Sequence, residues 1–487
     1  GNPLTPDKVL LGKAPFFEEQ VSSDGTMACA TCHLPEAGGA DLHAGTRQPG
    51  NDHLFFTPDD EFGSPGMVRQ DPAGAYLRDP AFGIARQATN RNAPTVFGAA
   101  FFDAVFWDKR AGQIFRDEAG QVVLPALAAL ETQAVFPPVS PIEMGHDARP
   151  WSEVVAKLER VRPLDLARDL PLPLELFIAG ATYGDLFQRA FGSPGITRER
   201  FAMAIASYER TLVPDHAPYD LSTMTPLQTT GFAIFQTQGN CSQCHTVSNG
   251  LFSSGLMSTI NVPNHQRSVK IPTLRNVGLQ RRLTSSGFFA NLDEVVTHYE
   301  NQRFFPNRLT AGERRAVLAF LGNGLTDERV LRREPPFDRP TLHSEVEPVG
   351  SNQYGQAWPG TGGFLPELIS HVPAVLGSPD FKLGLGNALG SSTAFLMIGV
   401  AQSASGTTFH GIPLHVAPTQ FQVLARPLSA GGAGQGVATF QVPLPGTVAL
   451  IGQTRFVQAF VPDPDAIGGF AASRGARIEL VSERLAP

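Results

Sequence analysis

The sequence predicts a multidomain protein in which two mainly α-helical domains precede an all-β sandwich. Its 487 residues are enough for about three domains at ~150 residues each. The pattern Cys-x-x-Cys-His occurs twice, at residues 29–33 and 241–245, and a helix-like segment precedes each copy. From about Gly350, charged residues become rare, and short alternating apolar runs are separated by Gly, Pro and Ser.

The two Cys-x-x-Cys-His motifs have the spacing of c-type haem attachment sites. Two thiols can each form a thioether to one porphyrin, and the adjacent histidine can reach the iron as its proximal ligand. Zinc sites usually space two such cysteine pairs by only about 15–20 residues, and disulfide frameworks suit much shorter chains. We therefore expect two covalently bound haem c groups that use every cysteine of the chain, held by Cys29, Cys32 and His33 and by Cys241, Cys244 and His245.

Residues 1–225 are expected to form the first cytochrome c-type haem domain. Residues 34–91 are polar and rich in Gly, Pro and Asp, which predicts a long loop. Apolar spacing and turn residues predict helices over 7–20, 125–134, 151–161 and 198–212.

Residues 226–345 are expected to form the second cytochrome c-type haem domain. Gly231 precedes Phe235 just as Gly12 precedes Phe16, which indicates a weak internal repeat. Asn291 and Thr310 each have Glu three residues later, a pattern that predicts two capped helix starts. On the first of these helices, apolar spacing gives one buried face to Leu292, Val295, Val296 and Tyr299.

Residues 350–487 are expected to form the β sandwich as an accessory domain. Runs with a period near two predict strands over 420–424, 454–460 and 478–481. The segment contains no cysteine.

Charge and hydropathy exclude some partners. The formal net charge of −7 argues against binding to nucleic acid or to anionic membranes. The best apolar run, 394–401, is far shorter than the ~18–20 residues that cross a bilayer. No signal peptide is visible, and c-type haem is attached outside the cytoplasm, so we expect a mature exported, periplasmic form.

Several motifs follow one another in a characteristic order. With the two haem motifs, they are similar to the bacterial di-haem cytochrome c peroxidase and MauG family over roughly residues 5–335. The β sandwich lies outside the family pattern and resembles a domain appended to some exported bacterial proteins. The other motifs are Leu11-Gly12-Lys13, Ser23-Asp24-Gly25-Thr26, Arg91-Asn92-Ala93-Pro94-Thr95, Phe106-Trp107-Asp108, Pro141-Ile142-Glu143-Met144-Gly145 and Pro272-Thr273-Leu274-Arg275-Asn276.

The resemblance implies a MauG-like peroxidase that reduces H₂O₂ at the N-terminal haem. Oxidising equivalents would pass through the second haem to an electron-donor protein (a small c-type cytochrome or a copper protein) or to a protein substrate. Glu143 would be the acid–base residue over the first haem, assisted by Gln133, and Trp107 would lie between the haems as a relay. The family also carries a calcium ion, for which Asn92 and the carbonyls of Lys270 and Pro272 are the matching positions.

The distal ligands depart from the family pattern or have rivals. Classical members place a loop histidine where this chain has Ile84, which predicts an open or differently gated first haem; His43 and His53 are weaker candidates. On the second haem the matching residue is Tyr299, and His298 and Met257 are the alternatives.

Two other functional classes stay open. The chain would be a non-catalytic di-haem electron-transfer protein if both irons had strong ligands on both sides. Alternatively, it would modify a partner protein that docks through the β sandwich.

Overall fold

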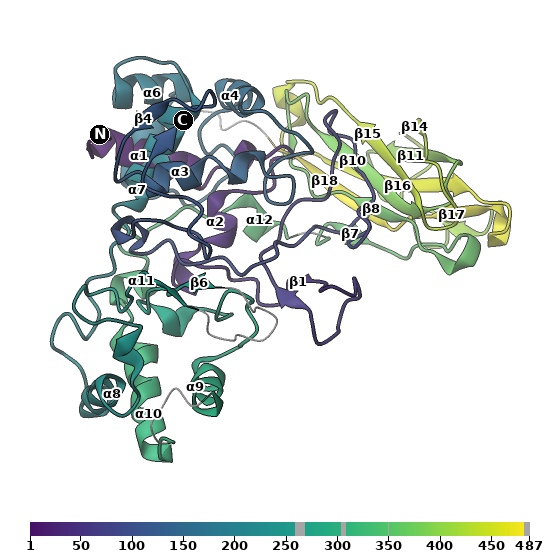
Figure 1. The fold of residues 1–487 in the computed structure, drawn as a ribbon. Helices are drawn as coiled ribbons and strands as arrows, with labels where there is room; N and C mark the ends of the chain where they lie inside the picture. The colour runs from purple at the N-terminus through teal and green to yellow at the C-terminus, as the bar shows by residue number, and fades with distance from the viewer. Residues whose placement is uncertain (259–267, 303–307, 349, 482–487) are drawn as a thin grey trace.

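The computed structural model describes residues 1–258, 268–302, 308–348 and 350–481, and Figure 1 shows their elements in three groups. One group of helices surrounds the N-terminus, a second lies below it, and the strands form a third on the right. The first group contains α1 (Pro6–Phe16), α2 (Cys29–Cys32), α3 (Ala129–Ala134), α4 (Trp151–Arg160), α5 (Leu172–Ile178), α6 (Tyr183–Phe191) and α7 (Arg198–Glu209). The later helices are α8 (Pro226–Gln236), α9 (Leu292–Asn301), α10 (Ala311–Ala319), α11 (Glu328–Arg332) and α12 (His343–Val346).

A glycine lets two helices cross closely in each helical group. A Cβ on Gly12 of α1 would overlap the carbonyl oxygen of Ala204 in α7. A Cβ on Gly231 of α8 would overlap the carbonyl oxygen of Ala316 in α10 in the same way. Only glycine permits so close a backbone approach. The internal repeat noticed in the sequence therefore corresponds to the same helix–helix contact in both groups.

Helix starts with side-chain caps agree with the sequence. The side chain of Asn291 accepts from the backbone N–H of Glu294, and Thr310 and Glu313 form a reciprocal capping box. The helix predicted over 125–134 is wrong at its start, since α3 begins at Ala129. Leu127 has φ 55°, a left-handed conformation that cannot continue a right-handed helix. The helix predicted over 7–20 ends at Phe16.

The strands of residues 353–481, here called the β region, confirm the predicted C-terminal β structure. One of its two main sheets has the order β14-β11-β16-β18-β7, with β17 paired to β16 and β9 paired to β18; the other has the order β15-β10-β8. Two further strands, β12 (Thr408–Phe409) and β13 (Ile412–Pro413), pair only with each other. Leu385 of β10 and Leu396 of β11 belong to one core, so the two sheets share their apolar interior. The strands are β7 (Gln353–Tyr354), β8 (Glu367–Ile369), β9 (Ala374–Val375), β10 (Lys382–Ala388), β11 (Thr393–Gly399), β14 (Phe421–Pro427), β15 (Gly436–Gln441), β16 (Thr454–Pro462), β17 (Phe470–Ala472) and β18 (Gly475–Val481).

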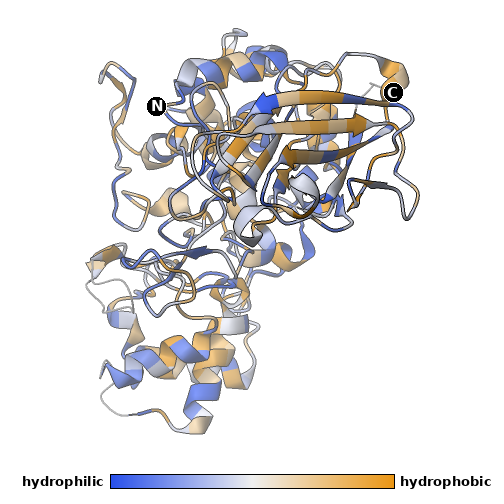
Figure 2. Cartoon of the chain, turned by 90° about the vertical axis from the view of Figure 1, so that its right-hand side faces the viewer, coloured by the Kyte–Doolittle hydropathy of each residue, from blue (hydrophilic) through white to orange (hydrophobic). Residues whose placement is uncertain are grey.

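In Figure 2 the long strands of the β region are mostly hydrophobic, and the helices carry both hydrophobic and hydrophilic residues. No helix within the described ranges is both long and apolar enough to cross a membrane.

The chain returns to the first helical group after leaving the second. Val330, Phe337 and Leu342 belong to the same core as α1 and α7, and the Phe337 ring lies 4.8 Å from that of Phe97. The long loop after the first motif holds only two short strands, β1 (Arg47–Gln48) and β2 (Glu61–Phe62). Its second half packs against the β region through a cluster of Val68, Tyr76, Ile84, Ile369 and Val437.

Candidate functional site

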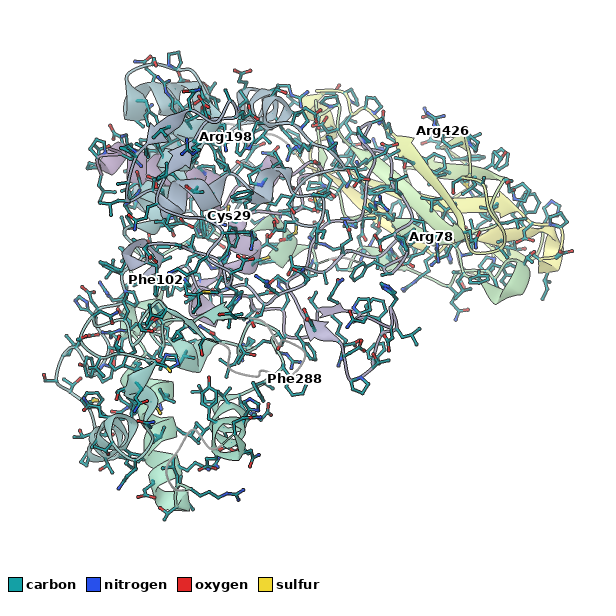
Figure 3. All side chains as sticks on the ribbon, in the orientation of Figure 1. Cys29, Arg78, Phe102, Arg198, Phe288 and Arg426 are labelled. Carbon is teal, nitrogen blue, oxygen red and sulfur yellow. The ribbon has the colours of Figure 1, made fainter. Side chains whose placement is uncertain are left out.

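A cavity of about 460 Å³ lies against the first Cys-x-x-Cys-His motif. Figure 3 places Cys29 well inside the first helical group. Cys29, Cys32 and His33 contribute to the cavity wall. Segments far away in the sequence supply the rest of it, so the fold gathers most of the residues proposed for peroxide chemistry and calcium. Trp107, Gln133, Glu143, Asn92 and Lys270 all line the cavity.

His33 is oriented for ligation by a backbone contact. Its Nδ1 lies 3.1 Å from the carbonyl oxygen of Gly39. A carbonyl only accepts, so Nδ1 carries the proton and Nε2 keeps its lone pair for a metal. Both cysteines of the motif are free thiols and half-buried. These three residues and the cavity beside them fit a covalently attached haem.

Glu143 is half-buried in the cavity wall on a turn that follows Pro141. Its backbone N–H donates to Ser140 Oγ over 3.3 Å. Burial raises the pKa of the Glu143 carboxyl, while a hydrogen bond from Ser140 and the charge of Arg110 oppose the shift. A carboxyl with a raised pKa holds a proton more readily than an ordinary carboxylate does.

Trp107 and Gln133 reach the cavity from separate elements. Gln133 is on α3, which packs against α7. Trp107 is buried, and its Nε1–H donates to the carbonyl of Asn92 over 2.7 Å. The carbonyl of Trp107 accepts from the backbone N–H of Lys270 over 2.7 Å. Trp107 is therefore hydrogen-bonded to residues before and after the second motif.

The three positions matched to calcium are Asn92, Lys270 and Pro272. Asn92 and Lys270 lie where the first cavity meets the segment after the second motif. The amide of Asn92 donates from Nδ2 to the carbonyls of Arg282 and Thr284, over 3.0 and 3.3 Å. These bonds leave its Oδ1 as the oxygen that could serve a cation. The Lys270 ammonium lies 4.0 Å from the centre of the Phe102 ring, and burial lowers its pKa to about 8.

The second motif repeats the geometry of the first. His245 Nδ1 lies 2.9 Å from the carbonyl of Phe252, so its Nε2 is also left for a metal. Cys241 and Cys244 are free and half-buried. This set likewise fits a covalent haem.

Tyr299 on α9 lies close enough to the second motif for its cysteines to act on the phenol. Burial and the nearby thiols of Cys241 and Cys244 raise the pKa of its phenol to about 12. The ring of His298 lies 5.1 Å from that of Phe289. Met257 lies on the short strand β5 (Met257–Ser258), paired opposite Lys270, with 40% of its surface exposed. The cysteines of the second motif act electrostatically on Tyr299.

Among the described residues that line the cavity, His33 is the only histidine. No other lining histidine is therefore available as a distal ligand. His43 binds Asp41 through Nδ1 over 2.7 Å, and His53 is exposed. Ile84 is buried in the cluster that joins the loop to the β region.

The sequence did not reveal two charged residues at the cavity, Glu209 and Arg110. Burial and the charge of Glu131 raise the pKa of the Glu209 carboxyl to about 8. Glu209 is the last residue of α7, which is buried from Ala204 to its end, and no local pattern marks its side chain as facing a cavity. Arg110 lies over the Phe106 ring at 3.5 Å from its centre and influences Glu143.

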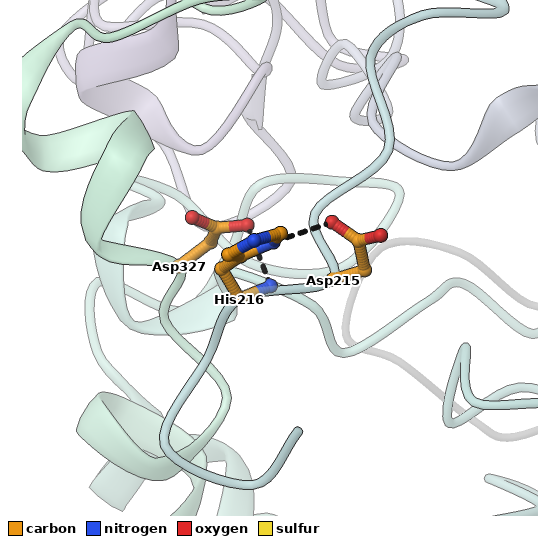
Figure 4. A group of neighbouring side chains, drawn as sticks. All are labelled: Asp215, His216 and Asp327. Atoms are coloured by element: carbon orange, nitrogen blue, oxygen red, sulfur yellow. Dashed lines mark hydrogen bonds and ion pairs between the residues drawn. The ribbon is translucent and has the colours of Figure 1, made fainter. Parts of the chain in front are cut away.

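A separate group of potential metal ligands consists of Asp215, His216 and Asp327 (Figure 4). The guanidinium of Arg329 bonds to both carboxylates, each over 2.6 Å. This guanidinium therefore already offsets one of the two carboxylate charges.

Comparisons with known proteins agree with the motifs. The model of the family described as di-haem cytochrome c peroxidase matches residues 6–225. Methylamine utilization protein MauG of Methylophilus methylotrophus is 27% identical over 322 residues, which is 62% of this chain and 74% of that protein. Cytochrome c peroxidase Ccp of Escherichia coli is 26% identical over 320 residues, 60% of this chain and 53% of that protein. Among solved structures, a MauG-like protein associated with microbial copper homeostasis is similar at TM-score 0.45 and 22% identity, over 69% of this chain and 93% of that one.

Proposed function

We propose that the chain is an exported MauG-like peroxidase, because residues 6–225 match the family described as di-haem cytochrome c peroxidase and the similar curated proteins include MauG and a cytochrome c peroxidase. A haem bound to Cys29, Cys32 and His33 would supply an iron that binds peroxide and exchanges electrons with it. A second haem would be held by Cys241, Cys244 and His245, with Tyr299 as its distal residue.

Glu143 is the proposed acid–base group. Reduction of H₂O₂ to two water molecules consumes two electrons and two protons. The Glu143 carboxylate takes the proton from one oxygen and returns it to the other, which leaves as water. Gln133 orients the peroxide through its amide. The raised pKa of Glu143 supports this role, because the carboxyl can hold the proton between the two transfers.

Trp107 is the proposed relay between the two haem sites. Its indole lines the cavity, and its carbonyl bonds to Lys270 in the segment after the second motif. The two electrons come from an external donor, which is a small c-type cytochrome, a copper protein or a protein substrate. A calcium ion bound by Asn92 and the carbonyls of Lys270 and Pro272 would stabilise this boundary, and the site of action is the periplasm.

One observation carries the proposal: Glu143, Gln133 and Trp107 share one cavity with His33. The test is Glu143→Gln in the protein with both haems, with peroxide-dependent oxidation of a small dye as the readout. We expect a roughly 10²–10⁴-fold loss of turnover with unchanged haem content. Glu118→Gln, on an exposed turn, is the matched control. Undiminished turnover in Glu143→Gln would exclude the acid–base role.

A pure electron carrier is the second candidate, and it requires strong ligands on both faces of both irons. The histidine-free distal wall favours the peroxidase. A high-spin signal in the resting ferric spectrum would rule out the carrier, and two fully low-spin haems would support it.

A further inference from the structure

We propose that the β region positions the first haem cavity, with Lys382 and Thr439 acting through the wall loop, defined as residues 64–91. The acid–base part of this inference rests on the proposed function. The β region would then be a structural part of the peroxide site rather than a separable docking module.

The first step is the contact between the β region and the wall loop. Lys382 of β10 is buried, and its Nζ donates to Gln70 Oε1 over 2.6 Å and to the carbonyl of Gly74 over 2.5 Å. The backbone N–H of Tyr76 donates to Thr439 Oγ1 of β15 over 2.8 Å. Lys382 and Thr439 thus hold the loop at Gln70, Gly74 and Tyr76.

Apolar packing adds to these bonds. Ile84 packs against Gly386 of β10 so closely that a Cβ on this glycine would overlap the Ile84 side chain. Tyr76 and Ile84 share a buried cluster with Ile369 and Val437 of the β region. The strand surface is thus shaped to receive the loop, and the two are close-packed at Gly386.

The second step runs from the wall loop to Glu143. The backbone N–H of Met67 donates to the carbonyl of Ile142 over 2.9 Å, and Gln87 Nε2 donates to the carbonyl of Pro141 over 2.9 Å. These carbonyls belong to the two residues directly before Glu143. Ser64 and Thr89, near the ends of the loop, line the same cavity as Glu143.

Gln70 links the same lysine to the haem motif. Its Oε1 accepts from Lys382, while its Nε2 donates to Asp24 Oδ2 over 3.1 Å. Asp24 also accepts from the hydroxyl and backbone N–H of Thr26, within the turn that leads to Cys29. The Lys382 ammonium therefore orients an amide that spans from the β region to the turn before the first motif.

The test uses the full-length protein with both haems and compares Lys382→Met and Thr439→Val with wild type. Both substitutions keep side-chain bulk. Lys382→Met removes the two polar contacts to Gln70 and Gly74, and Thr439→Val removes the one to Tyr76. We expect altered resting EPR and optical features of the first haem, unchanged features of the second, and an about 10- to 100-fold slower reaction with peroxide. Thr439→Ser, which keeps the hydroxyl, should restore the wild-type values. Arg426→Met, on the outer strand β14 away from Arg78 and the loop (Figure 3), is the control for lost charge.

Hydrogen exchange provides a readout that does not depend on peroxide chemistry. In Lys382→Met, exchange should accelerate in residues 64–91 and 139–145 but not in 241–254. Unchanged spectra and exchange in both variants, or equal changes at both haems, would overturn the positioning role. If wild type fails to react with peroxide while the first-haem changes persist, the proposed function fails and the positioning role stands.

Discussion

The indole Nε1–H of Trp107 donates to the backbone carbonyl of Asn92 over 2.7 Å, and the Asn92 side chain bonds onward to the carbonyls of Arg282 and Thr284. One tryptophan and one asparagine thus join the first cavity to the segment that follows the second motif. Because these bonds are buried, the ring is held in one orientation at the boundary between the two haem sites.

Trp107→Phe should separate peroxide chemistry from electron delivery. Phenylalanine fills most of the volume but is harder to oxidise and leaves the Asn92 carbonyl without its donor. We expect the initial peroxide reaction to persist, electron transfer from the second site to slow at least tenfold, and folding stability to fall by about 1 kcal/mol. Stopped-flow spectroscopy of both haems measures these rates. Trp358→Phe removes a comparable indole bond to the Ile467 carbonyl and should leave transfer unchanged; equal rates in both variants would refute the relay.

Tyr299→Met should raise the reduction potential of the second haem. A phenolate ligand favours the higher oxidation state, whereas His/Met ligation favours reduction. Spectroelectrochemical titration of each haem measures the shift. Tyr354→Met in the β region is the matched control, since its hydroxyl bonds only to the backbone in the described contacts, at His415. A second-haem potential that does not respond to Tyr299→Met, but does respond to His298→Gln, would transfer the ligand role to His298.

Stability should fall as pH rises from about 4.5 to about 7 because of Glu18. Burial raises the pKa of this carboxyl from its ordinary 4.5 to about 7, against hydrogen bonds from Leu164, Gln20 and Tyr183. The folded state therefore binds more protons than the unfolded state in this window. Each pH unit inside it costs about 1.4 kcal/mol of folding free energy for such a group. Denaturant unfolding at several pH values should show this slope in wild type and a shallower one in Glu18→Gln. An identical slope in the two proteins would assign the pH dependence to other groups.

Calcium removal should lower thermal stability if Asn92 supplies a ligand. A cation that binds only the folded state stabilises it by mass action, so the melting temperature should rise with calcium concentration and fall with chelator. Asn92→Ala should abolish this dependence, while Asn51→Ala, in an exposed loop, should keep it. A calcium response that survives in Asn92→Ala would place the ion elsewhere.

The sequence by itself determined the features that depend on nearby residues. Both haem motifs, the caps at Asn291 and Thr310, and the change to strands after Gly350 rest on short-range spacing, and the structure contains them at those positions. The start of α3 was missed because a left-handed residue, Leu127, has no reliable sequence signal when it is not glycine.

Only the tertiary structure decided which distant residues share a cavity. Glu143 and Trp107 were matched through motifs, but Glu209 and Arg110 enter the same cavity through packing that no local pattern encodes. From the sequence, Ile84 was notable only because family members have a histidine at that position. The structure shows that its side chain is buried against Gly386 of the β region. Such contacts form between residues that are far apart in the sequence, because packing the loop against the sheet removes the apolar surface of both from water.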